Sequence, residues 1–334
     1  MKSAARVVYS WPVYHADATV LPEGFLLLSS LSEWKGPEQQ IADGLAIRRL
    51  KLAEMTAVAS SHSLLQHHGI DSTAGQGYWL CYEFENGHPP DSVKFRRRQD
   101  AAFKMMHHAL YAIQILLPIG ASNLFLLYRQ TEDAPRFQCS EHRPAYIGTA
   151  WARLCDTPAS FAEDIPVLLA RVRETFQKPI LRLQIPVWLL EQGLSAPDRH
   201  IRILLWATGL DGVTRSGGVA AFHDRLCSLL GADTEIFPPG TATCRPKFRV
   251  AEVAADLYLL RTEMAHGLPF HEKFRKKRGF LTDGGAAGAS ELVNCRYDQV
   301  LEECSGFLLC KALREVFLRN ISFDVQAGCW SPSS

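Results

Sequence analysis

The way helical and strand signals divide along the chain constrains its fold more than any other feature. From residue 158 onward, apolar residues recur at helical spacing, strand signal is nearly absent, and the connections carry glycine and proline. Amphipathic helices must cover their apolar faces with one another, so we expect an all-α helical bundle over 158–325, followed by a flexible tail over 326–334. The predicted helices are 161–176, 199–210, 218–230, 248–266 and 291–320.

The first half, residues 1–157, is predicted to be a mixed α/β region. Short apolar runs bounded by turn residues indicate strands, and longer segments with helical periodicity indicate helices. The fold class is therefore expected to be α+β, with the boundary to the bundle near 155–160. The predicted strands are 24–31, 45–52, 78–84 and 124–128, the predicted helices are 53–68 and 92–117, and the polar stretch 132–146 is predicted to be a loop.

Composition excludes several classes of protein. Lys plus Arg number 36 and Asp plus Glu 35, so the net charge of +1 cannot hold the chain to nucleic acid or membrane by bulk attraction. No apolar run is long enough to cross a bilayer. The nine cysteines include no C-x-x-C pair, which predicts reduced thiols in a cytoplasmic protein rather than a zinc site or a disulfide framework.

The motifs of several enzyme classes are missing as well. The sequence holds no phosphate-binding loop, dinucleotide fingerprint, zincin motif or serine-hydrolase elbow. Its histidines are poorly spaced for one metal: His107 and His108 are adjacent on a predicted helix, and His62 lies five residues before His67. We therefore expect neither a metal nor a cofactor.

The segment 248–269 holds the candidate site. Its apolar residues form one face of a helix that Gly267 and Pro269 terminate, with Arg261 and His266 in the final two turns. On a regular helix these two side chains diverge by roughly 140°, so they converge only if His266 lies at the frayed end. An arginine can hold a phosphoryl group and a histidine can move a proton, which together suffice to cleave RNA without metal.

A second Arg–His pair, Arg136 and His142, has similar spacing but lies in the predicted loop, with no helix to hold it. The pair at 261 and 266 has more context, because the stretch resembles the HEPN superfamily, specifically its Apea-like branch. Three ordered elements carry the resemblance: the run ILLWATGLD ending at Asp211, the run AAFHDRLCSLLG with Phe222, Arg225, Leu229, Leu230 and Gly231, and the set Leu257, Tyr258, Arg261, His266 and Gly267.

The resemblance implies a metal-independent endoribonuclease. His266 would be the general base or acid, Arg261 would stabilise the transition state, and Asp211 would orient one of them. It also implies a homodimer formed through the bundle. A bacterial toxin or antiphage effector would fit such a chain, with residues 1–157 sensing a protein or phage-derived trigger or restraining the bundle.

Two basic runs lie on predicted surfaces. The first begins a few residues after His266 and could guide an RNA backbone toward the site; its cations are Lys273, Arg275, Lys276, Lys277 and Arg278. The second opens the predicted helix 92–117, where the helix dipole gives cations no benefit; it comprises Lys94, Arg96, Arg97 and Arg98. A solvated surface is the alternative for the first run and the favoured interpretation of the second.

Two other functions stay open. In the first, the bundle is a non-catalytic module that dimerises and binds RNA, a nucleotide or a protein; Thr262 directly after Arg261, and an aspartate rather than a glutamate at 211, favour it. In the second, the α/β half is an enzyme and the bundle its oligomerisation platform, which would need a polar pocket lined by His62, His67 or His107.

Overall fold

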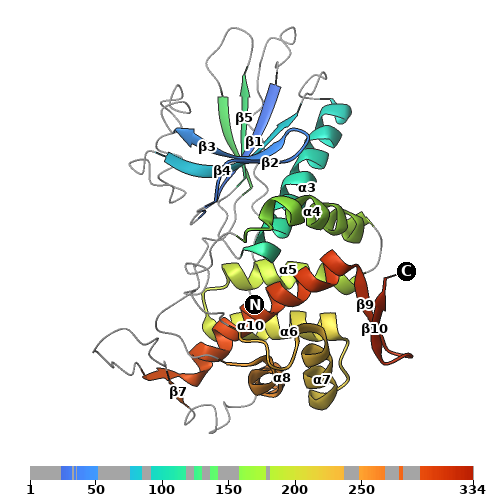
Figure 1. The fold of residues 1–334 in the computed structure, drawn as a ribbon. Coiled ribbons are helices and arrows are strands. Elements are labelled where there is room, and N and C mark those ends of the chain that lie inside the picture. Colours follow the sequence, from blue (N-terminus) through green and yellow to red (C-terminus); the bar gives the residue numbers. More distant parts are fainter. Residues whose placement is uncertain are drawn as a thin grey trace, which may run out of the picture.

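A computed structural model of the chain has the expected α+β fold. It describes residues 24–31, 34, 36–51, 76–84, 92–117, 124–129, 136–141, 158–177, 181–236, 248–267, 278–280 and 294–333. Figure 1 shows a sheet at one end of the molecule and most of the helices at the other. No helix in these residues has the length and apolar character needed to span a membrane.

The larger sheet has six strands in the order β2-β3-β4-β1-β5-β6, and every neighbouring pair is antiparallel. The sequence predicts the four inner strands and misses both edge strands. An edge strand bonds to a single neighbour and tolerates polar residues, which explains why β6 was expected to be a loop. The strands are β1 (Gly24–Ser30), β2 (Gln39–Ala42), β3 (Leu45–Lys51), β4 (Gln76–Phe84), β5 (Leu124–Arg129) and β6 (Arg136–Glu141).

Helices dominate the second half, as predicted, and α5 is the one that the sequence pattern misses. Its interior contains Pro186 and Gly193, which normally interrupt a helix. The predicted helix 53–68 lies outside the described residues, and the predicted helix 291–320 begins at Tyr297. The described helices are α3 (Val93–Leu116), α4 (Phe161–Gln177), α5 (Leu181–Ser195), α6 (Arg199–Thr214), α7 (Val219–Leu230), α8 (Val250–Ala265) and α10 (Tyr297–Arg319).

Part of the segment 326–334, which the sequence predicts to be a flexible tail, forms a strand. Strands β9 (Ile321–Asp324) and β10 (Cys329–Pro332) form an antiparallel hairpin that packs on α7. The Trp330 indole donates to the Arg225 carbonyl at 3.3 Å, and the Arg225 guanidinium lies 4.1 Å from the centre of the Phe323 ring. These aromatic contacts fix the C-terminal segment. A shorter ladder joins β7 (Arg278–Phe280) to β8 (Asn294–Arg296), so the second half is not free of strands.

One hydrophobic core runs from the sheet into the helices. It includes Leu45 and Leu80 of the sheet, the C-terminal half of α3, and the inner faces of α4 to α8 and α10. Helix α3 lies beside the sheet and reaches α4, α5 and α10 (Figure 1). The boundary expected near 155–160 is therefore crossed by continuous packing, and five described cysteines are free thiols within or around this core.

Helices α5 and α6 approach each other closely through a glycine. A Cβ atom added at Gly193 would lie 2.6 Å from Cε2 of the buried Trp206 and closer still to its Nε1. That indole nitrogen donates to the Leu190 carbonyl at 3.2 Å, so it cannot move away without breaking a buried hydrogen bond.

Gly193→Ala is therefore expected to lower the free energy of unfolding by about 2 kcal/mol through overpacking, even though alanine is the better helix former. Gly217→Ala is the control, since its Cβ would meet nothing within 4 Å. Urea unfolding followed by circular dichroism measures both. Equal stability of the two variants would contradict this account of the α5–α6 contact.

His108 marks the junction of α3 and α4. Its ring lies 5.2 Å from the ring of Phe176, which in turn stacks on Tyr111 at 5.4 Å. Burial, together with the nearby charges of His107, Arg173 and Lys104, lowers the pKa of His108 from 6.5 to about 4. The native state therefore holds this imidazole neutral.

This pKa shift predicts acid sensitivity. Because the folded pKa of His108 lies below its unfolded value, the stability linked to the neutral ring is fully present above pH 6.5 and is lost as the pH falls toward 4. His108→Gln should reduce the difference in melting temperature between pH 7 and pH 5, as measured by thermal unfolding in matched buffers. Parallel pH curves for the two proteins would refute the assignment.

Candidate functional site

The structure brings Asp211 of α6 and Arg261 of α8 together. Nη2 of Arg261 lies 2.6 Å from Oδ2 of Asp211, and their side chains are 23% and 16% exposed. Asp211 lies in the last turn of α6, where the helix dipole disfavours a carboxylate. Two partners offset this cost, because the hydroxyl of Ser216 donates to the other oxygen, Oδ1.

The Arg261 side chain lies beside an aromatic ring of its own helix, and that ring in turn contacts one from α7. The Arg261 guanidinium lies 5.1 Å from the centre of the Tyr258 ring, a cation–π distance. Tyr258 contacts the fully buried Phe222 of α7 at 5.3 Å between ring centres. Residues from all three elements that carry the HEPN resemblance therefore lie in one neighbourhood.

A clamp from α7 and the hairpin holds the turn that follows α6. Arg215 adopts a left-handed conformation, with φ of 52°. Nη1 of Arg225 donates to the carbonyl of Thr214 at 3.1 Å and to that of Arg215, and Nη1 of Arg215 donates to the carbonyl of Phe323 at 3.0 Å. This clamp fixes the position of Ser216 and, through it, the orientation of the Asp211 carboxylate.

His266 forms no bond with this pair in the described part of the chain. Helix α8 ends at Ala265, and Gly267 has φ of +66°, so the predicted helix stop is confirmed. The His266 side chain is exposed, and within the described part of the chain no hydrogen bond or ion pair joins it to Arg261 or Asp211. The hydroxyl of Thr262 turns back to the Tyr258 carbonyl at 2.9 Å, so it does not bridge the gap.

The remaining candidates fall mostly outside the described residues. Of the basic run after His266, residues 273–277 are not described, and Arg278 is described only as the first backbone position of β7. His62, His67 and His142 also lie outside. Among the described residues, no group of His, Cys, Asp or Glu side chains is arranged to hold a metal ion.

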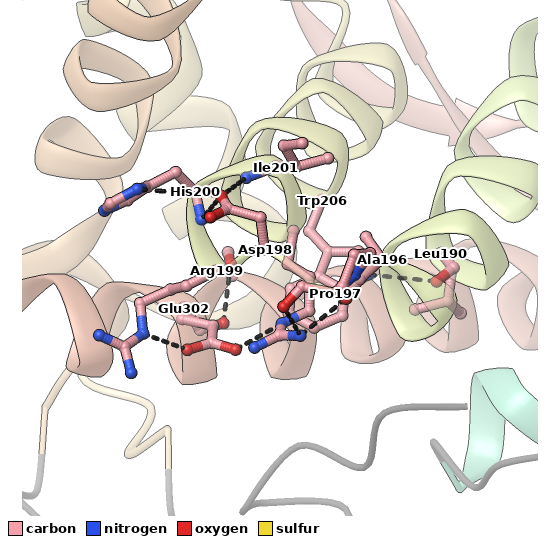
Figure 2. Close-up of polar contacts among 11 residues, drawn as sticks. Leu190, Ala196, Pro197, Asp198, Arg199, His200, Ile201, Trp206 and Glu302 are labelled. Atoms are coloured by element: carbon pink, nitrogen blue, oxygen red, sulfur yellow. Dashed lines mark hydrogen bonds and ion pairs between the residues drawn. The ribbon is translucent and has the colours of Figure 1, made fainter. Parts of the chain in front are cut away.

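A second polar cluster, which sequence reasoning missed, joins α6 to α10. The buried carboxylate of Glu302 lies between two arginines, with Nε of Arg199 at 2.8 Å and Nε of Arg202 at 2.6 Å (Figure 2). Nη1 of Arg202 also donates to the carbonyls of Ala196 and Pro197, at 2.7 and 3.3 Å. The sequence gives no clear signal for it, because Glu302 is one of several charged residues in α10 and nothing in the pattern marks it as the buried one.

Asp198 and Arg202 fix the start of α6. Oδ1 of Asp198 accepts from the backbone N–H groups of His200 and Ile201 at 2.8 and 3.1 Å, and these hydrogen bonds lower its pKa. Arg202 then ties the first turn to α10 through Glu302. The α6 helix is therefore anchored at its start by this cluster and at its end by Arg225.

Comparisons with known protein families, with curated proteins and with solved structures find no match to this chain. Function is therefore inferred from the geometry above and from the resemblance in the sequence.

Removal of the Glu302 charge should destabilise the fold. Glu302→Gln leaves two arginine charges against the core without their carboxylate, and we expect a loss of about 3 kcal/mol in the free energy of unfolding. Glu315→Gln on the same helix is the control, because Glu315 pairs with the exposed Arg319 at 3.8 Å; its expected loss is below about 0.5 kcal/mol. Comparable losses in urea unfolding would show that the cluster is not an anchor.

Proposed function

We propose that the chain is a metal-independent endoribonuclease of the HEPN type. The observation that carries this proposal is the 2.6 Å contact between Asp211 and Arg261. These residues lie on different helices, and only the resemblance predicts that they share a site. The resemblance also supplies the roles: Arg261 for the transition state, His266 for proton transfer and Asp211 for orientation.

The geometry of Arg261 suits a phosphoryl group. One guanidinium nitrogen contacts Asp211, and the Tyr258 ring centre lies 5.1 Å from the guanidinium carbon. The side chain keeps 23% of its surface exposed. A guanidinium carries five N–H donors in a planar fork, so donors remain for two oxygens of one phosphate. The ion pair with Asp211 thereby orients the fork without consuming it.

The exposed imidazole of His266 is the proton-transfer group in this proposal. It would take the proton of an RNA 2′-hydroxyl, whose oxygen then attacks the adjacent phosphorus to form a 2′,3′-cyclic phosphate, while the bond to the 5′-oxygen breaks and that oxygen takes a proton from water. Arg261 would stabilise the charge that develops on the phosphorane oxygens. Because His266 and Arg261 are not joined in one chain, the proposal includes a homodimer in which two α8 helices approach each other. Leu259, which is 36% exposed on α8, is an apolar residue that such a contact between helices could bury.

In this proposal RNA is guided by the basic run at 273–278, and residues 1–157 sense a trigger or restrain the bundle. The role of a bacterial toxin or antiphage effector belongs to the same proposal.

A non-catalytic RNA-, nucleotide- or protein-binding module is the second candidate function. The lack of a described bond between His266 and the Asp211–Arg261 pair favours it, as does the Thr262 hydroxyl, which donates to a carbonyl of its own helix. In that case the arginine contacts phosphate and no proton is transferred.

Cleavage of labelled RNA in EDTA tests the proposal. We expect the purified protein to cut RNA, His266→Ala to abolish cutting, and Arg261→Lys to lose at least about 100-fold, because a point charge cannot replace the planar fork. His223→Ala, at another solvent-accessible histidine, is the control and should cut normally. Melting temperatures verify that each variant is folded.

Two outcomes would decide against catalysis. If wild-type and His266→Ala preparations degrade RNA equally, the activity belongs to a contaminant. If neither cuts but Arg261→Ala weakens RNA binding, the protein is the binding module.

A further inference from the structure

The α3 helix presents a basic face that the proposed site does not use. Five exposed residues, the first at position 94 and the others three, four, seven and ten residues later, lie within an arc of about 120° around the helix axis. We call them the α3 stripe: Lys94, Arg97, Arg98, Ala101 and Lys104. The stripe extends about 15 Å along the helix axis at 1.5 Å per residue.

The opposite face of this segment is fixed in the core. Phe95 and Gln99 are each 7% exposed, and the hydroxyl of Ser92 caps the helix by accepting from the Phe95 N–H at 3.1 Å. The orientation of the stripe is therefore set by burial, and its side chains cannot turn inward.

Most cations of the stripe form no ion pair with the described residues. Among the described residues, none forms an ion pair or hydrogen bond with the side chains of Lys94, Arg97 or Lys104. Asp100 is the one acid in α3, and it lies one helical turn from Arg96, Arg97 and Lys104, so three cations share its charge. The first turn of α3 contains no acid, although acids are the residues that the positive end of a helix favours.

A second helix adds to the same surface. Arg173 of α4 is exposed, and both Arg173 and Lys104 lie close enough to His108 for their charges to lower its pKa. Positive charge from two helices thus accumulates where α3 meets α4. Such an arrangement costs free energy in the isolated protein through mutual repulsion and is relieved by a bound polyanion.

We propose that the α3 stripe, together with Arg173, binds the phosphate backbone of single-stranded RNA. Arginine guanidinium groups match phosphate oxygens, and a row of cations along 15 Å suits several successive phosphates. A membrane surface is disfavoured, because the apolar face of this helix is already buried and leaves only Val93 exposed beside the stripe. The choice of RNA rests on the proposed function.

Binding of a fluorescent 2′-O-methyl RNA, followed by anisotropy over a range of salt concentrations, tests the inference. This RNA has no 2′-hydroxyl to attack, so binding is measured whether or not the protein is a nuclease. For Arg97→Gln/Lys104→Gln we expect about tenfold weaker binding at low salt and a salt slope smaller by about 1.4, at 0.7 per phosphate contact.

The matched control is Arg249→Gln/Arg319→Gln, which removes the same charge at side chains that are 59% and 57% exposed elsewhere. It should bind nearly as tightly as the wild type. The inference is overturned if both double variants weaken equally, if the stripe variant binds normally, or if wild-type protein ignores RNA and binds phosphatidylserine vesicles. Loss of binding in the stripe variant with no cleavage by any protein would refute the nuclease and leave the stripe standing.

Discussion

The buried carboxylate of Glu302 is the constraint on which the helical half depends. It lies on α10, the helix that contacts α3 to α8, and a charge in that position must be paired. Among the described residues, α6 supplies the partners, through Arg199 and Arg202. This pairing holds the axial position of α6 against α10, because a shift along the axis would break at least one of the two ion pairs of the carboxylate.

The candidate site depends on that position. Asp211 lies at the far end of α6, about 14 Å along the axis from Arg202 at 1.5 Å per residue. Close contacts keep the intervening segment in place: Gly193 admits Trp206, and a Cβ added at Gly209 would lie 2.8 Å from Leu309. Arg225 then holds the last turn. A site built on a helix fixed at both ends presents its carboxylate in one orientation, which is what orienting an arginine requires.

Short-range sequence patterns predict those elements whose residues are stabilised mainly by their neighbours along the chain. The inner strands and the stop of α8 at Gly267 follow from hydrophobic runs and turn residues. The edge strand β6 and the hairpin of β9 and β10 cannot be predicted in this way, because neighbouring elements stabilise them. Trp330 and Phe323 of the hairpin, for example, contact Arg225 of α7. Helix α5 was missed for the same reason, since packing outweighs the local cost of Pro186. The Asp211–Arg261 contact was expected from the resemblance, whereas no spacing rule connects Arg202 to Glu302 across the sequence.

The position of α3 decides how a ligand at one end of the molecule relates to the other. Its C-terminal half is buried against α10, where the thiol of Cys310 donates to the Gln114 carbonyl at 3.4 Å. The α3 stripe and the site on α6 and α8 therefore lie on elements that share one packed core, and not on two bodies joined by a hinge. A close-packed core transmits little gradual deformation. RNA held at the stripe would then act on the site mainly by raising the local concentration of the same strand, a gain that depends on strand length and not on a change in the protein.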